Sequence, residues 1–264
     1  MRQLFLLSFL SLTLWAQVHY AKVEPYRHVV LKSAVSGMVV EVDLAAEGTM
    51  VRKGRVVQID DALDRVDLND TRRSIMLLEE MVTINREIAD SLAQTVRRQK
   101  GYYERIAKLS TASKTQKDNA YNAYASAKTQ YLGVKEKIIS LKKQLLDMRY
   151  KAARLEDTIA KKALIVDNQF LYKLMVREGD FVAPGTPLAE VEDMQKAKLV
   201  LYLEPEELAD IEKKSVYLND IKTRYRVDKV WRTTDERYIS SYRAEIYIPA
   251  PKGKFSELIK VEIK

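Results

Sequence analysis

The side chains that most often carry out chemistry in proteins are scarce in this chain. Among its 264 residues there is no cysteine, and there are only two histidines, His19 and His28. The missing thiols exclude a cysteine nucleophile, a disulfide framework, a zinc ribbon and an iron–sulfur site. Two histidines leave little material for a metal site or a Ser-His-Asp triad. Since the sequence also lacks a phosphate-binding loop and a nucleophile elbow, we expect no catalytic residues, no cofactor and no bound metal.

The amino-terminal segment is expected to direct export. Arg2 supplies a positive charge, residues 4–14 are mostly apolar, and Ala16 precedes the polar Gln17. This order is typical of a signal peptide, and the apolar run is shorter than the roughly 20 residues that a membrane span requires. We therefore predict a signal peptide over residues 1–16 and a mature chain outside the cytoplasm. An uncleaved membrane anchor is the alternative.

The middle of the chain has the period of a coiled coil. Apolar residues recur at alternating spacings of three and four in two runs, 68–106 and 120–159. This 3.5-residue period marks the seam of a left-handed coiled coil. Because the two runs are mirror images about residue 113, we predict an antiparallel helical hairpin over residues 62–163, with its turn at 109–114. A helical hairpin inside an ordinary globular fold is the alternative.

The segments that flank the predicted hairpin share a motif. The pattern Gly-x-x-Val-x-x-Gly, followed by an apolar residue, occurs at 48–57 and again at 179–188. Both copies lie in β-branched segments with the character of strands. We expect their glycines to form turns with positive φ. These glycines are Gly48, Gly54, Gly179 and Gly185.

The repeated motif predicts how the chain is divided. Residues 17–61 and 164–192 are expected to form the two halves of one β-domain that the hairpin interrupts. Residues 193–264 contain four stretches of strand character and a short helix at 206–213, which Pro205 would start. The expected fold class is α+β, with a split β-domain, a long hairpin and a small, mostly β carboxy-terminal domain.

This arrangement resembles the periplasmic adaptor family, also called membrane fusion proteins (HlyD-like), of tripartite efflux and secretion systems. The two glycine motifs are similar to the halves of that family's lipoyl-like domain, and Gly37 matches a turn before one of its strands. The resemblance implies a lipoyl-like β-sandwich split by the coiled-coil hairpin and followed by a β-barrel-like domain. The family's membrane-proximal domain is expected to be absent or reduced.

The predicted turn is similar to the family's hairpin tip, where an Arg and a Leu precede a Ser and a Gln/Glu-x-Asp-x-Ala stretch. Arg105 and Leu109 have the family's spacing of four between the Arg and the Leu, and Ser113 precedes the matching stretch at residues 116–120. The loop is shorter than usual, so either Ser110 or Ser113 takes the place of the family's serine. The resemblance implies that these residues contact a partner, whereas solvated turn residues are the alternative.

Positive charge gathers near the same turn. Between residues 97 and 117, seven cations stand against one anion, Glu104. The cations are Arg97, Arg98, Lys100, Arg105, Lys108, Lys114 and Lys117. They form either a solvated face or a field that steers the tip toward an acidic partner. No groove-reading motif accompanies them, so we expect no nucleic-acid partner.

The resemblance implies a non-catalytic adaptor in the periplasm, associated with the inner membrane. Its implied partners are an inner-membrane transporter, an outer-membrane channel and further copies of itself in a ring or funnel. A lipoyl or biotinyl carrier would need a modifiable lysine at the turn between its β halves, and here the hairpin occupies that position. The alternative function is that of a structural coiled-coil envelope protein without a transport role.

Overall fold

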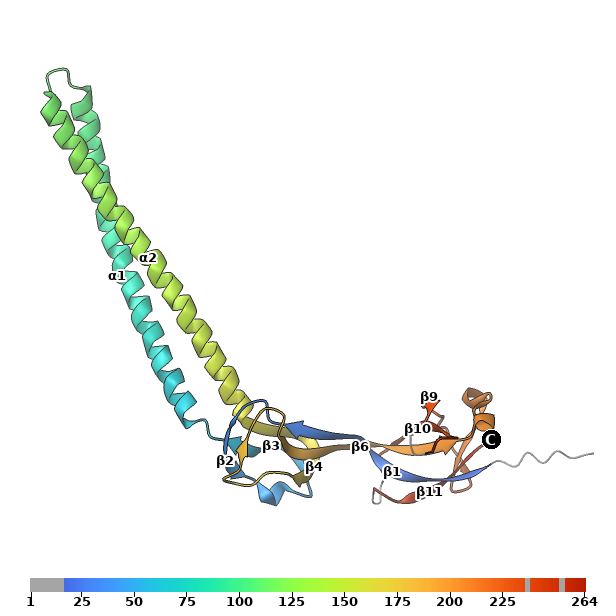
Figure 1. Ribbon diagram of the computed structural model, residues 1–264. Coiled ribbons are helices and arrows are strands. Elements are labelled where there is room, and N and C mark those ends of the chain that lie inside the picture. The colour runs from blue at the N-terminus through green and yellow to red at the C-terminus, as the bar shows by residue number, and fades with distance from the viewer. Residues whose placement is uncertain (1–16, 236–237, 252–254) are drawn as a thin grey trace, which may run out of the picture.

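The computed structural model describes residues 17–235, 238–251 and 255–264, so the predicted signal peptide lies outside the described residues. Two long helices project from one end of an elongated β-rich body (Figure 1). The chain enters and leaves the hairpin at this end of the body, and the carboxy-terminal strands lie at the other end. Among the described residues, no helix is long and apolar enough to span a membrane.

The predicted antiparallel hairpin is confirmed. Helix α1 (Ala62–Lys108) and helix α2 (Lys114–Lys162) are each about 70 Å long at 1.5 Å per residue. All of their buried residues belong to the two predicted seams. These residues are Leu68, Thr71, Val82, Asn85 and Ala89 in α1 and Ala120, Ala127, Leu141 and Ala152 in α2. Burial at these positions therefore follows the 3.5-residue period of a coiled coil.

Ion pairs between the helices show the register of the hairpin. Arg149 lies 2.7 Å from Glu79, and Arg72 lies 2.6 Å from Glu156. The two members of each pair lie almost equally far from residue 113, as the mirror symmetry of the seams requires. Because these side chains are exposed, each pair contributes at most about 1 kcal/mol. The seam therefore holds the helices together, and the ion pairs favour one alignment.

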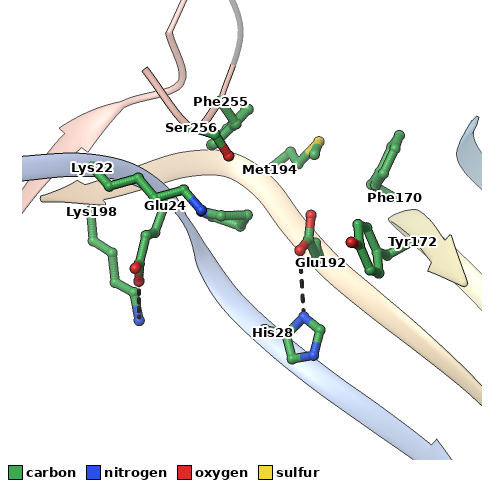
Figure 2. A pocket seen from close by; sticks show the side chains of 11 residues that line it. Lys22, Glu24, His28, Phe170, Tyr172, Glu192, Met194, Lys198, Phe255 and Ser256 are labelled. Atoms are coloured by element: carbon green, nitrogen blue, oxygen red, sulfur yellow. Dashed lines mark hydrogen bonds and ion pairs between the residues drawn. The ribbon is translucent and has the colours of Figure 1, made fainter. Parts of the chain in front are cut away.

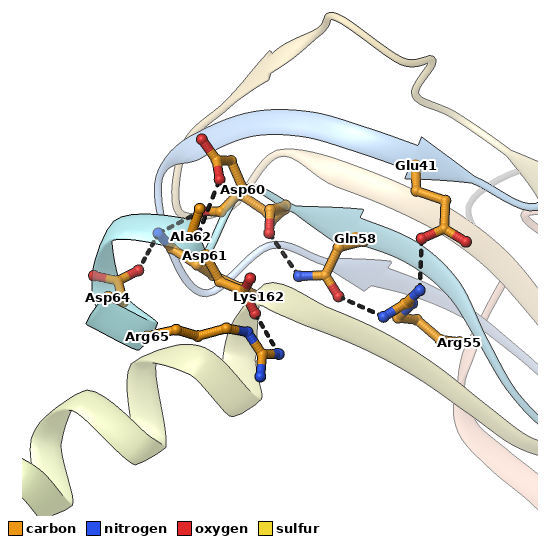
Figure 3. Close-up of polar contacts among 10 residues, drawn as sticks. Glu41, Arg55, Gln58, Asp60, Asp61, Ala62, Asp64, Arg65 and Lys162 are labelled. Carbon is orange, nitrogen blue, oxygen red and sulfur yellow. Dashed lines mark hydrogen bonds and ion pairs between the residues drawn. The ribbon is translucent and has the colours of Figure 1, made fainter. Parts of the chain in front are cut away.

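Polar contacts join the two ends of the hairpin at its base (Figure 3). The ammonium group of Lys162, the last residue of α2, donates to the backbone carbonyl of Asp60 at 2.6 Å and pairs with Asp64. Asp61 lies 2.7 Å from Arg65. The hydrogen bond from Arg65 and the charges of Arg65 and Lys162 lower the pKa of Asp61, although burial opposes them. This stabilising contribution is present at neutral pH and is lost as the pH falls below about 4.

The first β unit takes strands from both sides of the hairpin. Its antiparallel order is β5-β2-β3-β4-β6-β1. The strands are β1 (Val18–Lys32), β2 (Gly37–Val42), β3 (Thr49–Ile59), β4 (Ala163–Leu174), β5 (Phe181–Val182) and β6 (Pro187–Leu203). Val39 and Ile59 from one side pack with Leu171 and Val191 from the other in a single core. A 3-10 helix, η1 (Leu44–Ala46), lies between β2 and β3.

The second β unit surrounds a separate core. Its strand order is β9-β10-β6-β1-β11-β7-β8, and no pairing joins β8 to β9 in the part of the chain that the structure describes. The added strands are β7 (Val216–Leu218), β8 (Ile221–Lys222), β9 (Lys229–Thr234), β10 (Tyr242–Pro249) and β11 (Leu258–Ile263). Leu199, Leu201, Ile246 and Val261 are buried in this core. Among the described residues this sheet is therefore open.

Two strands differ from the expected division of the chain. Strand β1 pairs with β11 through residues 18–22 and with β6 through residues 23–32. Ala21 and Val23, which we expected in the first β half, are therefore buried in the second core. Strand β6 likewise continues through the expected boundary at residue 192. A strand's own pattern shows that it has a buried face but not which core covers that face.

The helix expected at 206–213 is also different. Two 3-10 helices, η2 (Pro205–Leu208) and η3 (Ile211–Lys213), replace it, with Pro205 at the start of the first. Asp210 between them has a φ of 53°, in the left-handed region. A continuous α-helix cannot include a residue with this backbone conformation.

The glycines of the repeat do not all form turns. Gly48, Gly179 and Gly185 have φ values of 76°, 90° and 92°, which favour glycine. At Gly37, an added Cβ would lie 2.5 Å from Ile59 Cγ2, so close packing requires glycine there. Gly54, in contrast, lies within β3 opposite Val166, and the turn predicted at this position is wrong. Because β3 pairs with β4 over almost its whole length, the chain cannot turn at this residue.

The first prediction concerns the independence of the β units. Gln58 of β3 lies opposite Ala163 of β4, so a short turn can replace residues 62–162. We expect the shortened chain to unfold cooperatively with a β-type circular dichroism spectrum, because neither β core includes a residue of the hairpin. The same shortened chain with Val191→Asp should not fold, since the charge would enter the first core. An unfolded shortened chain without Val191→Asp would contradict this prediction.

Candidate functional site

The tip of the hairpin lies at the point of the structure farthest from the β units (Figure 1). Helix α1 ends at Lys108, α2 begins at Lys114, and residues 109–113 connect them. Leu109 is the carboxy-terminal cap of α1, and its backbone N–H donates to the carbonyl of Ile106 at 3.2 Å. The Leu109 side chain is 49% exposed, although leucine is usually buried. The tip therefore presents an apolar side chain to solvent.

The two candidate serines of the tip have different environments. The Ser113 hydroxyl accepts a hydrogen bond from the backbone N–H of Gln116 at 3.2 Å, and Gln116 Oε1 accepts one from the Ser113 N–H at 2.9 Å. These reciprocal bonds are a capping box, which satisfies two free donors at the start of α2. Within residues 17–235, no hydrogen bond of the Ser110 side chain is found. Ser113 thus starts the helix, and Ser110 offers its hydroxyl to solvent.

Arg105 lies one helical turn before the tip. Its side chain is exposed and folds back along α1 toward Gly101. A Cβ added to Gly101 would lie 3.6 Å from Arg105 Nη1. Gly101 thus leaves room beside this guanidinium. In the part of the chain that the structure describes, Arg105 has no ion pair, so its charge is available to a partner. A guanidinium offers several donors that suit carboxylates and backbone carbonyls.

Tyrosines hold the two helices together just below the tip. The ring of Tyr103 in α1 lies edge-on to Tyr121, with 5.4 Å between centroids, and parallel to Tyr124 at 6.3 Å. Such aromatic pairs stabilise by about 1 kcal/mol beyond their buried area. Tyr121 contributes although it lies off the strict seam, and about half of its surface remains exposed. The tyrosines therefore fill the seam just below the tip, and they also widen the apolar surface near it.

The cations near the tip are mostly without acidic neighbours. Lys100 pairs with Glu104 at 3.6 Å, and this is the only ion pair formed by the seven cations among the described residues. Arg98 donates to Thr95 Oγ1 at 3.0 Å. The tip is therefore an electropositive surface with an exposed leucine, a hydroxyl and a guanidinium. Such a surface has the charge that attracts an acidic group.

The histidines are not brought together. His19 Nε2 lies 2.7 Å from Glu207 Oε1, whereas His28 Nδ1 lies 3.4 Å from Glu192 Oε1 in a different part of β1. Among the described residues, no group of three potential metal ligands is found. His28 Nε2 also lies 4.0 Å from Glu190 Oε2, so His19 has one nearby carboxylate and His28 has two.

A cleft of about 430 Å³ lies where β1 and β6 pass from one β unit to the other (Figure 2). Sequence reasoning missed it because its walls come from three strands and from residues 255–256. Two pairs of polar groups approach one another in its walls, with Glu24 at 3.9 Å from Lys198 and Glu192 at 3.4 Å from His28. Both of these carboxylates thus have a nitrogen partner, and Lys22 is a lining cation for which no ion pair is found among the described residues.

Comparison with protein-family models finds no match, and comparison with curated proteins finds none either. Solved structures, in contrast, are similar over 94% of this chain. MacA from Actinobacillus actinomycetemcomitans has a TM-score of 0.74 at 15% identity, and 78% of its chain is covered. A MacA–MexA chimeric protein with the Pseudomonas aeruginosa MexA alpha-hairpin domain has a TM-score of 0.62 at 16% identity, with 81% covered.

A third similar structure is described as a membrane fusion protein. The membrane fusion protein Spr0693 from Streptococcus pneumoniae has a TM-score of 0.59 at 10% identity, and 94% of this chain and 98% of that chain are covered. At these identities the likeness concerns the fold. This chain therefore has the fold of a membrane fusion protein, with a β-sheet body and a long helical hairpin.

The second prediction separates the roles of the two tip serines. Ser113→Ala removes the acceptor for the Gln116 N–H, so we expect the start of α2 to lose about 1 kcal/mol of stability. Ser110→Ala, the matched control, should change it by less than about 0.5 kcal/mol, because this hydroxyl makes no contact that the substitution removes. Amide hydrogen exchange at residues 115–118 measures both effects. Equal protection in the two variants would show that the capping box does not stabilise the tip.

Proposed function

We propose that this protein is a non-catalytic periplasmic adaptor that links an inner-membrane transporter to an outer-membrane channel for efflux or secretion. The observation that carries this proposal is the hairpin, which places a small, electropositive and partly apolar tip about 70 Å from the β units. A helical extension of this length suits a protein that must reach a distant partner. The fold shared with MacA and with the membrane fusion protein Spr0693 supports the same function.

The tip has the composition of a small docking site. A two-helix end offers little area, so binding there must depend on a few residues, typically an apolar anchor and a well-placed arginine. Leu109 provides the exposed anchor, and Arg105 and Ser110 provide donors beside it. The surrounding cations would increase the rate of encounter with an acidic channel mouth.

The hairpin also carries apolar residues that its own seam does not use. In α1, Leu77, Met81, Ile84 and Ile88 are between 42% and 62% exposed. Each of them comes one residue before a seam position. This regular spacing places them in a stripe along one face of the hairpin, which we call the α1 stripe.

Helix α2 has a second set, Leu132, Ile139 and Leu146, between 50% and 66% exposed. Each of these residues comes one position after a seam residue. In an antiparallel pair of helices, the residues that directly follow a seam residue in either helix lie on one face of the pair. The residues that directly precede a seam residue lie on the opposite face. The ion pairs between the helices follow this rule. Arg149 and Glu79 each directly follow a seam residue, whereas Lys151 and Asp67 each directly precede one. The α2 stripe therefore lies on the face opposite the α1 stripe.

Two different apolar stripes on opposite faces favour head-to-tail association. If the α1 stripe of one chain packs on the α2 stripe of the next, each chain has two neighbours, and the contact closes into a ring when the rotation permits. We propose that copies of this chain form a ring or funnel in this way. The alternative, a structural coiled-coil envelope protein, would use the same stripes but would not need the tip.

The third prediction tests docking at the tip. Leu109→Asp and Arg105→Asp should each abolish transport and co-purification of the outer-membrane channel, because they remove the apolar anchor and reverse the local charge. Both residues are exposed, so the free energy of unfolding should change by less than about 1 kcal/mol. Lys143→Asp, an exposed cation in the middle of α2, is the matched control and should behave like the wild type. Normal transport in both tip variants would favour the structural alternative.

The fourth prediction tests the stripes. The chain lacks cysteine, so introduced thiols report single contacts. A mixture of Ile84→Cys chains and Ile139→Cys chains should form crosslinked dimers on oxidation, because neighbouring chains would bring the two stripes together. A mixture of Glu87→Cys and Lys143→Cys chains, whose side chains are exposed outside both stripes, is the control and should remain uncrosslinked on oxidation. Equal crosslinking in the two mixtures would exclude association through the stripes.

A further inference from the structure

A second hollow lies in the second β unit, away from the tip and from the cleft between the units. It measures about 480 Å³ and is formed by the segment around η3 and by the loop that follows β8. Its walls contain Lys213, Lys214, Arg224 and Arg226, and Glu212 is its single carboxylate. We call it the basic hollow. Its volume falls in the usual range for small-ligand sites, roughly 300–1,000 Å³.

The two arginines of the basic hollow are directed by the core beneath them. Tyr225 and Val227 are partly buried and pack against the second core, whereas Arg224 and Arg226 are exposed and line the hollow, of which Tyr225 also forms part of the wall. This alternation is what an extended segment produces when every second residue is buried. Both guanidiniums therefore lie on the same side of the loop. In the part of the chain that the structure describes, neither of them forms an ion pair.

The backbone around the basic hollow is anchored. The Thr223 hydroxyl donates to the carbonyl of Val216 at 2.8 Å and accepts from the N–H of Tyr225 at 3.3 Å. Ser215 exchanges backbone hydrogen bonds with Lys264, at 2.6 and 3.0 Å. The arginines thus project from a loop tied to β7, and a ligand would not have to order the loop on binding.

The two lysines are partly engaged. Lys214 Nζ donates to the carbonyl of Glu207 at 2.8 Å, and Lys213 Nζ lies 2.7 Å from Asp210. The partner of the Lys214 ammonium is a neutral carbonyl, so this contact places no negative charge beside it. The hollow therefore holds more positive than negative charge even when Asp210 and Glu212 are both counted. A group of like charges held in one place is stabilised by an anionic ligand.

We propose that the basic hollow binds a phosphate group, carried either by an anionic lipid headgroup or by a soluble phosphate ester. Guanidiniums match the oxygens of phosphate with paired, charge-assisted hydrogen bonds, and an ammonium group adds a point charge. The Ser215 hydroxyl also lines the hollow and can donate to the same group. This site is independent of the proposed docking at the tip, since the two lie at opposite ends of the molecule.

The fifth prediction tests this site with inorganic phosphate as the probe. Titration into the isotope-labelled chain should give saturable shifts of backbone amides confined to residues 212–226. Arg224→Gln combined with Arg226→Gln should weaken the affinity roughly tenfold or more, because two charge-assisted contacts are lost. Lys142→Gln combined with Lys143→Gln, the matched control in the middle of the hairpin, removes the same charge and should change the affinity by less than about twofold.

A second measurement distinguishes the two sources of phosphate. Phosphatidylcholine vesicles with and without phosphatidylglycerol are sedimented with the chain. Binding that requires phosphatidylglycerol and both arginines identifies a lipid headgroup, whereas saturable phosphate binding without vesicle binding identifies a soluble ester. Arg226→Lys, which retains the charge, should keep part of the affinity for phosphate. This variant tests the site if the double arginine variant is misfolded. Absence of saturable shifts, or equal weakening by the hairpin control, would overturn the proposal.

Discussion

The structure depends on the antiparallel pairing of β3 with β4. This ladder runs from Thr49 opposite Leu171 to Gln58 opposite Ala163. Strand β3 leads into α1 and β4 follows α2, so the ladder holds the hairpin's two ends side by side and antiparallel. The register of the seams, the alignment of the ion pairs and the position of the tip all follow from it. Lys162 reinforces this arrangement, because it bonds to Asp60 and Asp64 at the start of the hairpin.

This arrangement separates stability from contact with partners. The two β cores contain no residue of the hairpin, and the hairpin has its own seam of small and branched apolar residues. A substitution at the tip therefore alters few buried contacts. The tip can present an exposed leucine and unpaired cations at little cost to the fold. Sites in proteins are often placed on such segments, held in position by a rigid scaffold.

Continuous strands link the two β units. Strands β1 and β6 each contribute to both cores, and they pair with each other from Val23 opposite Leu199 to Lys32 opposite Pro187. A register shift between Pro25 and Arg27 lies where the strands pass from one core to the other. The two units are therefore joined by a two-stranded ribbon rather than by a flexible linker. The same continuity anchors the second core, against which Tyr225 packs beneath the basic hollow.

The sequence by itself determined the hairpin, because a 3.5-residue period is a local property that any long coiled coil must show. Its mirror symmetry also located the turn, whereas Arg105, Leu109, Ser110 and Ser113 were singled out by the resemblance of this turn to the adaptor family's hairpin tip. Only the tertiary structure decided that Gly54 continues a strand and that Ala21 and Val23 belong to the second core. It alone showed that Ser113 is a helix cap and that Arg224 and Arg226 line a common hollow. The physical reason is that strand pairing and side-chain convergence join residues far apart in the chain, and no local period records which partner a strand has.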